Sequence, residues 1–167
     1  MKVKDFIYLL FALPLLSCES VTCPINNTVA CVYGFYASAR TSDGTFVEGS
    51  AINIGDTLTI TAMGVDSVVA NRLINKNGVS LPVSFYGDTD SLMFTFIDTL
   101  SAVGRDTIRI DKVNRAHLDD PSCPLHMWHT ITAVQSTHHL IDTVIINHSD
   151  INYDGLENLQ IYFRTAQ

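Results

Sequence analysis

Histidines are the most conspicuous metal-ligating residues of this chain, and four of the six, His126, His129, His138 and His139, lie close together in sequence. Clustered imidazoles are common zinc ligands. The surrounding sequence has the pattern of β-strands, however, so the first two histidines would point to opposite faces, as would the last two. The spacing also matches no helical zinc motif and includes no cysteine pair. We therefore expect neither a metal site nor a cofactor. If a metal ion were bound, these four histidines would be its candidate ligands.

The second chemically suggestive stretch is Leu15-Leu16-Ser17-Cys18, which ends a short apolar run. The run extends over 11 residues from Phe6 to Leu16, after two lysines. This length fits a signal-peptide core, whereas a membrane-spanning helix needs about 20 residues. Leucine at −3, serine at −1 and the cysteine itself resemble the lipobox of bacterial lipoproteins. The resemblance implies cleavage after Ser17 and acylation of Cys18, and two or more acyl chains attach a protein stably to a membrane. The alternative is an ordinary signal peptide with a coincidental cysteine.

With Cys18 acylated, three cysteines remain: Cys23, Cys31 and Cys123. Three cannot all pair within one chain, so an oxidising compartment favours one disulfide and one free thiol. Cys23 and Cys123 both precede a proline and lie outside the expected strands, whereas Cys31 lies in an apolar strand, where a free cysteine packs as a small hydrophobic residue. We predict a Cys23–Cys123 disulfide, with Cys31–Cys123 or no disulfide as alternatives. No cysteine is paired with a dedicated base, so we expect no cysteine-based catalysis.

A triplet of Asp, then Ser or Thr, then an aliphatic residue occurs six times, where composition alone predicts about one match. One explanation is strand entry, because aspartate favours turns and β-branched residues favour the strands that follow. The other is modification, because the triplet resembles the O-glycosylation motif of exported proteins of the Bacteroidota. The acceptors would then be Thr57, Ser67, Ser91, Thr99, Thr107 and Thr143.

Composition describes one acidic domain. Cleavage after Ser17 leaves 150 of the 167 residues, and removing two lysines and one aspartate leaves 8 basic against 16 acidic residues, a net charge of −8. So acidic a protein is a poor ligand for nucleic acid, whose affinity rests on phosphate neutralisation. Of the 17 acidic residues 14 are aspartate, which favours turns, whereas glutamate favours helices. The bias indicates an all-β chain.

Short apolar segments separated by Gly, Asn, Asp and Pro clusters predict about nine strands and no sustained helix. We expect an immunoglobulin-like β-sandwich of about seven to nine antiparallel strands. Residues 1–17 would form the signal peptide, 18–28 the lipid-anchored tether and 29–167 the single β-sandwich domain. Two of the strands, 128–135 and 141–147, are expected to pair as a hairpin.

Several pieces of this sequence resemble a family of small lipoproteins of unknown function from gut Bacteroidota. The resemblance covers most of residues 18–163 and is most specific from 123 to 147. It implies an envelope lipoprotein with a β-rich domain and brings no activity, substrate or catalytic residue. Cys31 is not part of the pattern. The matching pieces are Cys23-Pro24, Ser80-Leu81-Pro82, Asp106-Thr107-Ile108, Cys123, His129-Thr130-Ile131-Thr132, Thr137-His138-His139, Ile141-Asp142-Thr143-Val144-Ile145-Ile146-Asn147 and Ile161-Tyr162-Phe163.

These observations favour a lipid-anchored, non-catalytic binding or assembly module with an unknown protein or glycan partner. We expect it on the bacterial outer membrane, attached through acylated Cys18. It would face the periplasm, because residues 20–22 lack the acidic cluster of surface-exported lipoproteins, and the cell surface is the alternative. A carbohydrate- or metal-handling accessory lipoprotein is the second hypothesis. An enzyme is the third, since no phosphate loop, Gly-x-Ser-x-Gly elbow or His-Glu-x-x-His motif is present. An exposed aromatic patch would favour glycan binding.

Overall fold

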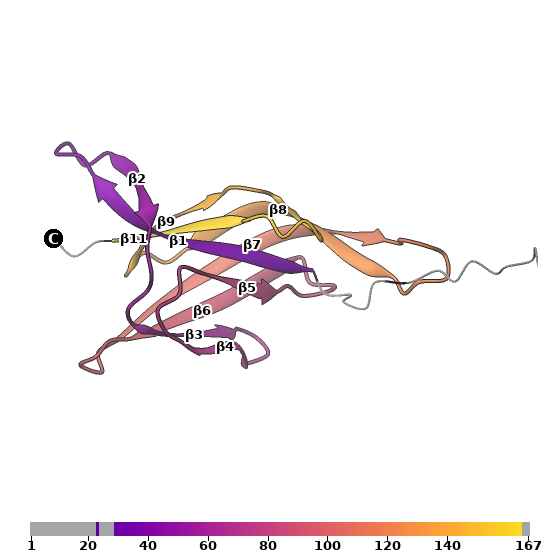
Figure 1. The fold of residues 1–167 in the computed structure, drawn as a ribbon, viewed down its shortest axis with the longest axis horizontal. Helices are drawn as coiled ribbons and strands as arrows, with labels where there is room; N and C mark the ends of the chain where they lie inside the picture. Colours follow the sequence, from indigo (N-terminus) through magenta and orange to yellow (C-terminus); the bar gives the residue numbers. More distant parts are fainter. Residues whose placement is uncertain (1–22, 24–28, 165–167) are drawn as a thin grey trace, which may run out of the picture.

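The computed structural model describes Cys23 and residues 29–164, and every regular element among them is a β-strand (Figure 1). The all-β class is confirmed, with eleven strands rather than seven to nine. The described residues contain no helix that could span a membrane. The signal peptide, Cys18 and most of the tether lie outside them. The strands are β1 (Ala30–Arg40), β2 (Phe46–Ala51), β3 (Thr57–Ala62), β4 (Ser67–Leu73), β5 (Gly78–Pro82), β6 (Thr89–Ile97), β7 (Val103–His117), β8 (His126–Ser136), β9 (Ile141–Ile146), β10 (Asp150–Ile151) and β11 (Leu159–Arg164).

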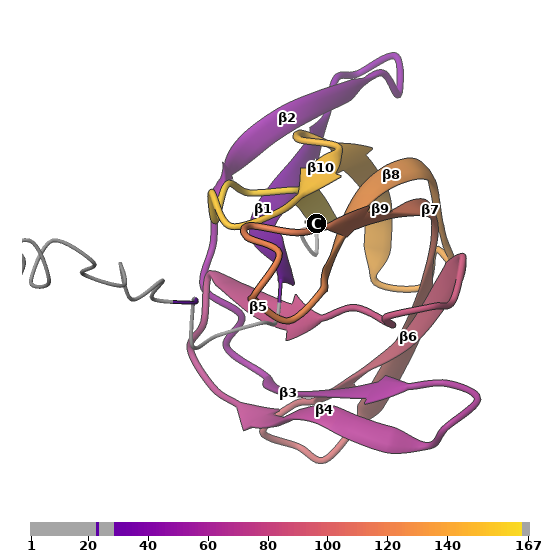
Figure 2. The same ribbon diagram turned by 90° about the vertical axis from the view of Figure 1, so that its right-hand side faces the viewer.

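The strands form two sheets. The first has the order β2-β1-β11-β9, and β5 also pairs with β1. The second has the order β10-β8-β7-β6-β3-β4, is antiparallel throughout and curls into a half-barrel (Figure 2). The first sheet departs from the expected antiparallel pattern because β1 and β11 are parallel, with Tyr33 opposite Leu159. The first and last strands of the domain are therefore neighbours.

One hydrophobic core joins the two sheets. Alternate residues of the central strands face it, as in β6, where Leu92, Phe94 and Phe96 are buried. Aromatic rings meet across the gap and within the first sheet: the centroid of Phe163 in β11 lies 5.5 Å from that of Phe96 in β6 of the second sheet and 5.7 Å from that of Phe35 in the neighbouring strand β1. Edge-to-face pairs of this kind add about 0.5–1.5 kcal/mol beyond their buried area.

The expected hairpin between residues 128–135 and 141–147 is wrong. β8 pairs with β7 and β10 in the second sheet, whereas β9 pairs with β11 in the first, so the connection crosses between sheets. It folds around the buried carboxylate of Asp106, which accepts hydrogen bonds from the backbone N–H groups of His139 (2.9 Å), Leu140 (2.7 Å) and Ile141 (2.9 Å) and from the Thr137 hydroxyl (2.6 Å). Burial raises the pKa of Asp106, but these hydrogen bonds outweigh it and hold the pKa below its ordinary value.

The structure contains the Cys23–Cys123 disulfide, which closes 100 residues. Cys123 lies in the turn between β7 and β8, and a loop of this length stabilises the fold by about 4–5 kcal/mol on the chain-entropy account. Cys31 is free and fully buried in β1. Burial raises the pKa of its thiol to about 12, so Cys31 acts as a core residue with no reactive thiolate at neutral pH.

Candidate binding site

A buried lysine is the unexpected feature of β7. The inward-facing residues of this strand are Asp106, Ile108, Ile110 and then Lys112, which is 3% exposed. The pairing of β7 with β8 shifts register between Asp111 and Lys112. At this bulge the Lys112 backbone N–H donates to the Asp88 carbonyl (2.8 Å) in the β5–β6 connection. Because side chains alternate along the strand, the charged side chain of Lys112 follows that of Ile110 at the end of this row of buried residues.

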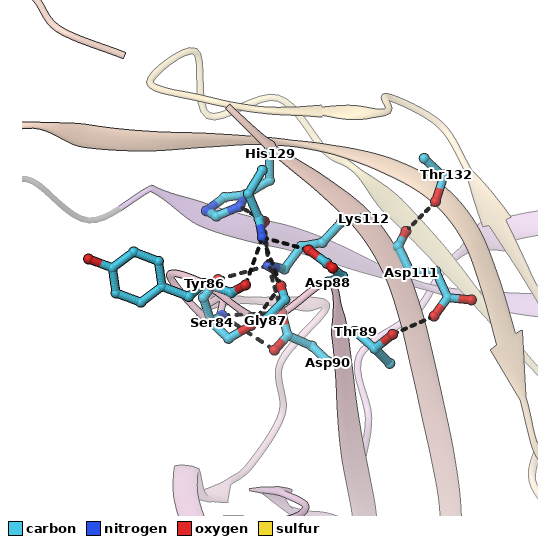
Figure 3. Close-up of polar contacts among 11 residues, drawn as sticks. Ser84, Tyr86, Gly87, Asp88, Thr89, Asp90, Asp111, Lys112, His129 and Thr132 are labelled. Atoms are coloured by element: carbon cyan, nitrogen blue, oxygen red, sulfur yellow. Dashed lines mark hydrogen bonds and ion pairs between the residues drawn. The ribbon is translucent and has the colours of Figure 1, made fainter. Parts of the chain in front are cut away.

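The Lys112 ammonium uses all its hydrogen-bond donors within the protein (Figure 3). Nζ donates to the carbonyls of Ser84 (2.8 Å) and Gly87 and to Oδ1 of Asn114 (2.8 Å), and it lies 3.7 Å from the Asp90 carboxylate. Burial lowers the pKa of Lys112, and the neighbouring aspartates oppose that shift. An amine engaged in this way is arranged to hold backbone in place rather than to attack a substrate.

Asn114 and His129 complete the network. The Asn114 side chain donates to the Tyr86 carbonyl, the Gly87 carbonyl and the Asp88 carboxylate, each at 3.1 Å. His129 Nδ1 lies 2.7 Å from Asn114 Oδ1. Burial, reinforced by the nearby Lys112 charge, lowers the pKa of His129 to about 4. The imidazole is therefore neutral at neutral pH and donates its Nδ1–H to Asn114.

The network fixes residues 83–88, which we call the aromatic loop. Its tip carries Phe85 and Tyr86, 39% and 81% exposed, with ring centroids 4.7 Å apart in an edge-to-face pair. The Asp90 carboxylate accepts a hydrogen bond from the Ser84 backbone N–H (3.2 Å). The Tyr86 ring points away from Lys112 (Figure 3). Two large rings are thus presented to solvent on a backbone held by a buried charge.

A hollow of about 520 Å³ lies beside the aromatic loop. Asp111 contributes a carboxylate that accepts hydrogen bonds from Thr89 (2.8 Å) and Arg109 (3.1 Å). The remaining lining residues are mainly polar: Asp88, Thr89, Lys112, Val113, Asn114 and Thr132. Carboxylates and hydroxyls that line a hollow of this kind can recognise a polar ligand.

The four predicted histidines do not converge. His126 is buried against Tyr153 (ring centroids 5.7 Å apart), His129 belongs to the lysine network, and His138 and His139 are exposed in the β8–β9 connection. Over Cys23 and residues 29–164, no three His, Cys, Asp or Glu side chains come together as a metal site.

The six triplets do not share one position relative to the strands. Structural contacts of their aspartates explain them better. Thr57 and Ser67 begin β3 and β4, but Thr107 lies inside β7 and Thr99 in the turn after β6. Four aspartates hold structure together: Asp90 and Asp106 as described, Asp98 by accepting hydrogen bonds from its own turn, and Asp142 by pairing with Arg40 and Arg164. Glycosylation stays a prediction. Ser67 and Thr99 are exposed, whereas the other four acceptors, Thr57, Ser91, Thr107 and Thr143, are partly buried.

Sequence reasoning missed Lys112, Asn114 and the aromatic loop. The available signal was period-2 alternation across β7, which places Lys112 on the same face as Ile108 and Ile110. A charged residue on a core-facing position needs buried partners. The sequence could therefore have indicated a buried polar network here, although not the loop that supplies the carbonyls.

These features define an all-β domain that presents a clamped aromatic loop. Residues 57–163 match a family of unknown function, DUF6452. Because the match spans more than half of the chain, the protein belongs to this family. The matched region includes the aromatic loop and its lysine network, whereas β1 and β2 precede it. No curated protein and no solved structure was found to match the chain.

Proposed function

We propose that this protein is a lipid-anchored binding module of the bacterial cell envelope, without catalytic activity, whose contact surface is the aromatic loop. Cys18 carries the lipid after removal of residues 1–17, residues 18–28 form the tether, and residues 29–167 form the domain. The protein comes from a gut bacterium of the Bacteroidota. It is attached to the outer membrane and faces the periplasm. The lipobox and the sequence resemblance support the location. An immunoglobulin-like relationship is part of the proposal, supported by two sheets that share one core.

One observation carries the binding function: a buried lysine and an asparagine hold a loop whose tip is an exposed tyrosine. Tyr86 is 81% exposed, yet its own carbonyl and that of Gly87 are hydrogen-bonded to the network. Ordering a loop before binding removes part of the entropic cost of association. Tyrosine is also enriched at protein interfaces and among the residues that dominate their affinity. A rigid tyrosine platform fits a recognition surface.

Site-specific photo-crosslinking tests this proposal. A benzoylphenylalanine in place of Tyr86 should give defined adducts in native envelopes, and the same group in place of Leu100 should not. Leu100 is a matched control because it is 87% exposed in a different turn. Lys112→Met, which releases the loop, should lower the adduct yield from position 86. Identical adducts from both positions, or none from position 86, would refute the proposed surface.

Labelling with a palmitate analogue tests the anchor separately. Wild-type protein should incorporate the label and Cys18→Ala should not, because acylation is expected at that thiol. Equal labelling of the two proteins would contradict the lipid anchor while leaving the binding surface open to its own test.

Carbohydrate handling is the second candidate function, because the hollow of about 520 Å³ is lined by carboxylates and hydroxyls and adjoins, at Asp88, the loop that carries the exposed ring of Tyr86. Glycan-panel binding by the purified domain should then be lost in Tyr86→Ala and retained in Leu100→Ala. Binding that is equal in both variants would exclude the aromatic loop as a sugar platform.

A further inference from the structure

The disulfide limits how far one end of the domain can lie from the lipid anchor. Cys18 precedes Cys23 by five residues, which span at most about 18 Å when extended. The Cα atoms of Cys23 and Cys123 are 5.5 Å apart. The β7–β8 turn therefore lies within about 24 Å of the acylated residue. Without the disulfide the first described residue of the domain would be Val29, and the tether could reach about 40 Å.

This constrained end has an apolar surface. Leu118 and Leu125 flank the turn that carries Cys123 and are 48% and 50% exposed. Behind them Trp128 packs against Tyr153, which is 42% exposed, with ring centroids 5.9 Å apart. Figure 1 shows the β7–β8 hairpin reaching beyond the rest of the domain, at the end opposite β2. Exposed leucines in front of tryptophan and tyrosine match the side-chain types that occupy a membrane–water interface.

The charges of the turn indicate which lipid surface it would tolerate. Asp119 lies 3.1 Å from Nε2 of His117 and 3.4 Å from Nε2 of His126, and Asp120 accepts hydrogen bonds from Ser122. Neither Asp119 nor Asp120 forms an ion pair with lysine or arginine within the described chain. Carboxylates at the tip are repelled by strongly anionic headgroups and are compatible with zwitterionic ones, whose ammonium groups can approach them.

We propose that the β7–β8 turn, residues 118–125, rests on the zwitterionic lipid surface that holds the Cys18 acyl chains, with Leu118 and Leu125 at headgroup level. The inference rests on the proposed lipid anchor and adds an orientation to it: the Cys23–Cys123 disulfide draws this end of the domain onto the bilayer. The 15-residue strand β7 then rises from the membrane, and the turn bearing Leu100 lies at its far end, about 45 Å away along the strand.

Two single-tryptophan proteins test this orientation. The chain has one tryptophan, Trp128, so the Trp128→Phe variant has no tryptophan fluorescence of its own. Leu118→Trp in this background is the tip reporter, and Leu100→Trp is the far reporter. Both are acylated proteins incorporated into phosphatidylcholine vesicles that contain headgroup-level spin-labelled lipid. We expect quenching of about twofold or more for the tip reporter, because an interfacial residue lies within reach of these labels, and no quenching for the far reporter.

Vesicle flotation separates failure of the anchor from failure of the orientation. If the acylated chain does not float with vesicles, the lipid anchor is refuted and the orientation falls with it. If it floats and the tip reporter is not quenched, or both reporters are quenched equally, the orientation is refuted while the anchor stands. Equal quenching would also show that an exposed tryptophan inserts wherever it is placed.

The disulfide has its own arm of the experiment. The tip reporter carrying Cys23→Ser and Cys123→Ser keeps Cys18 and has the longer tether. We expect it to float as before and to be quenched less. Unchanged quenching in a folded double variant would show that the disulfide does not hold the turn at the membrane and would overturn that part of the proposal.

Discussion

Replacing Lys112 with methionine tests the claim that a buried charge holds the aromatic loop. Methionine is similar in length and apolar, so the cavity left behind is small. It provides no donor for the carbonyls of Ser84 and Gly87 and no cation for Asp90, the partners of Nζ in the wild type. Breaking a buried charged interaction by removing one partner costs about 3–5 kcal/mol, out of a total stability of about 5–15 kcal/mol.

Urea unfolding followed by the fluorescence of Trp128 should therefore show a loss of about 3–5 kcal/mol in the free energy of unfolding of Lys112→Met. Limited chymotrypsin digestion should also cut the variant after Phe85 or Tyr86 under native conditions, because the loop that carries them is released. Lys76→Met is the matched control. Lys76 is the other lysine of the described residues and is exposed, so its replacement should change stability by less than about 0.5 kcal/mol.

Two results would refute this reasoning. If Lys112→Met is no less stable than Lys76→Met, the network contributes nothing net to the fold. If stability falls but the aromatic loop resists chymotrypsin as in wild type, Lys112 supports the core, and the loop is held by Asn114 and Asp90 alone.

Other parts of the structure give further expectations. The pKa of His129 in the folded state, about 4, lies below its ordinary 6.5, so the unfolded chain takes up a proton first on acidification. Stability should fall by roughly 3 kcal/mol between these pH values, and His129→Gln should flatten the dependence of unfolding free energy on pH; an unchanged slope would contradict the assignment. Asp106→Asn leaves a single acceptor oxygen for the β8–β9 connection and should cost about 3 kcal/mol in urea unfolding; a loss below about 0.5 kcal/mol, the range of surface changes, would mean that the carboxylate does not organise the crossing. Cys31 should resist alkylation in the native protein and react only after denaturation, and non-reducing peptide mapping should join Cys23 to Cys123; rapid native labelling of Cys31 would be inconsistent with its burial.

Local features of the sequence were enough to predict most of the strands, although not β2 or β10. Alternation of apolar and polar residues, turn residues between the segments and the excess of aspartate all act over a few neighbouring positions. The disulfide could also be anticipated, because Cys31 is set in an apolar segment while Cys23 and Cys123 stand next to prolines. Each of these inferences depends on what a residue's immediate neighbours require.

The partners of the strands depend on distant residues and could not be predicted in the same way. The segments 128–135 and 141–147 have the pattern of a hairpin, yet the Asp106 carboxylate, more than 30 residues earlier, draws the connection into a crossing between sheets. Likewise, alternation places Lys112 on the core face of β7, but nothing local indicates that the carbonyls of Ser84 and Gly87 will meet it there. The candidate binding site consists of contacts between residues that are far apart in the sequence.

The parallel pairing of β1 with β11 has a consequence for the speed of folding. The backbone N–H of Val32 donates to the side-chain oxygen of Asn158, a residue 126 positions later. As the chain emerges where it folds, β1 can pair with β2 and β5 early, but the edge that receives β11 stays open until the last strand has emerged. Folds that depend on pairings so distant in sequence close large loops before they gain the stabilising contacts, and all-β domains of this kind fold in milliseconds to seconds. The last step in building the first sheet therefore waits for the final residues of the domain.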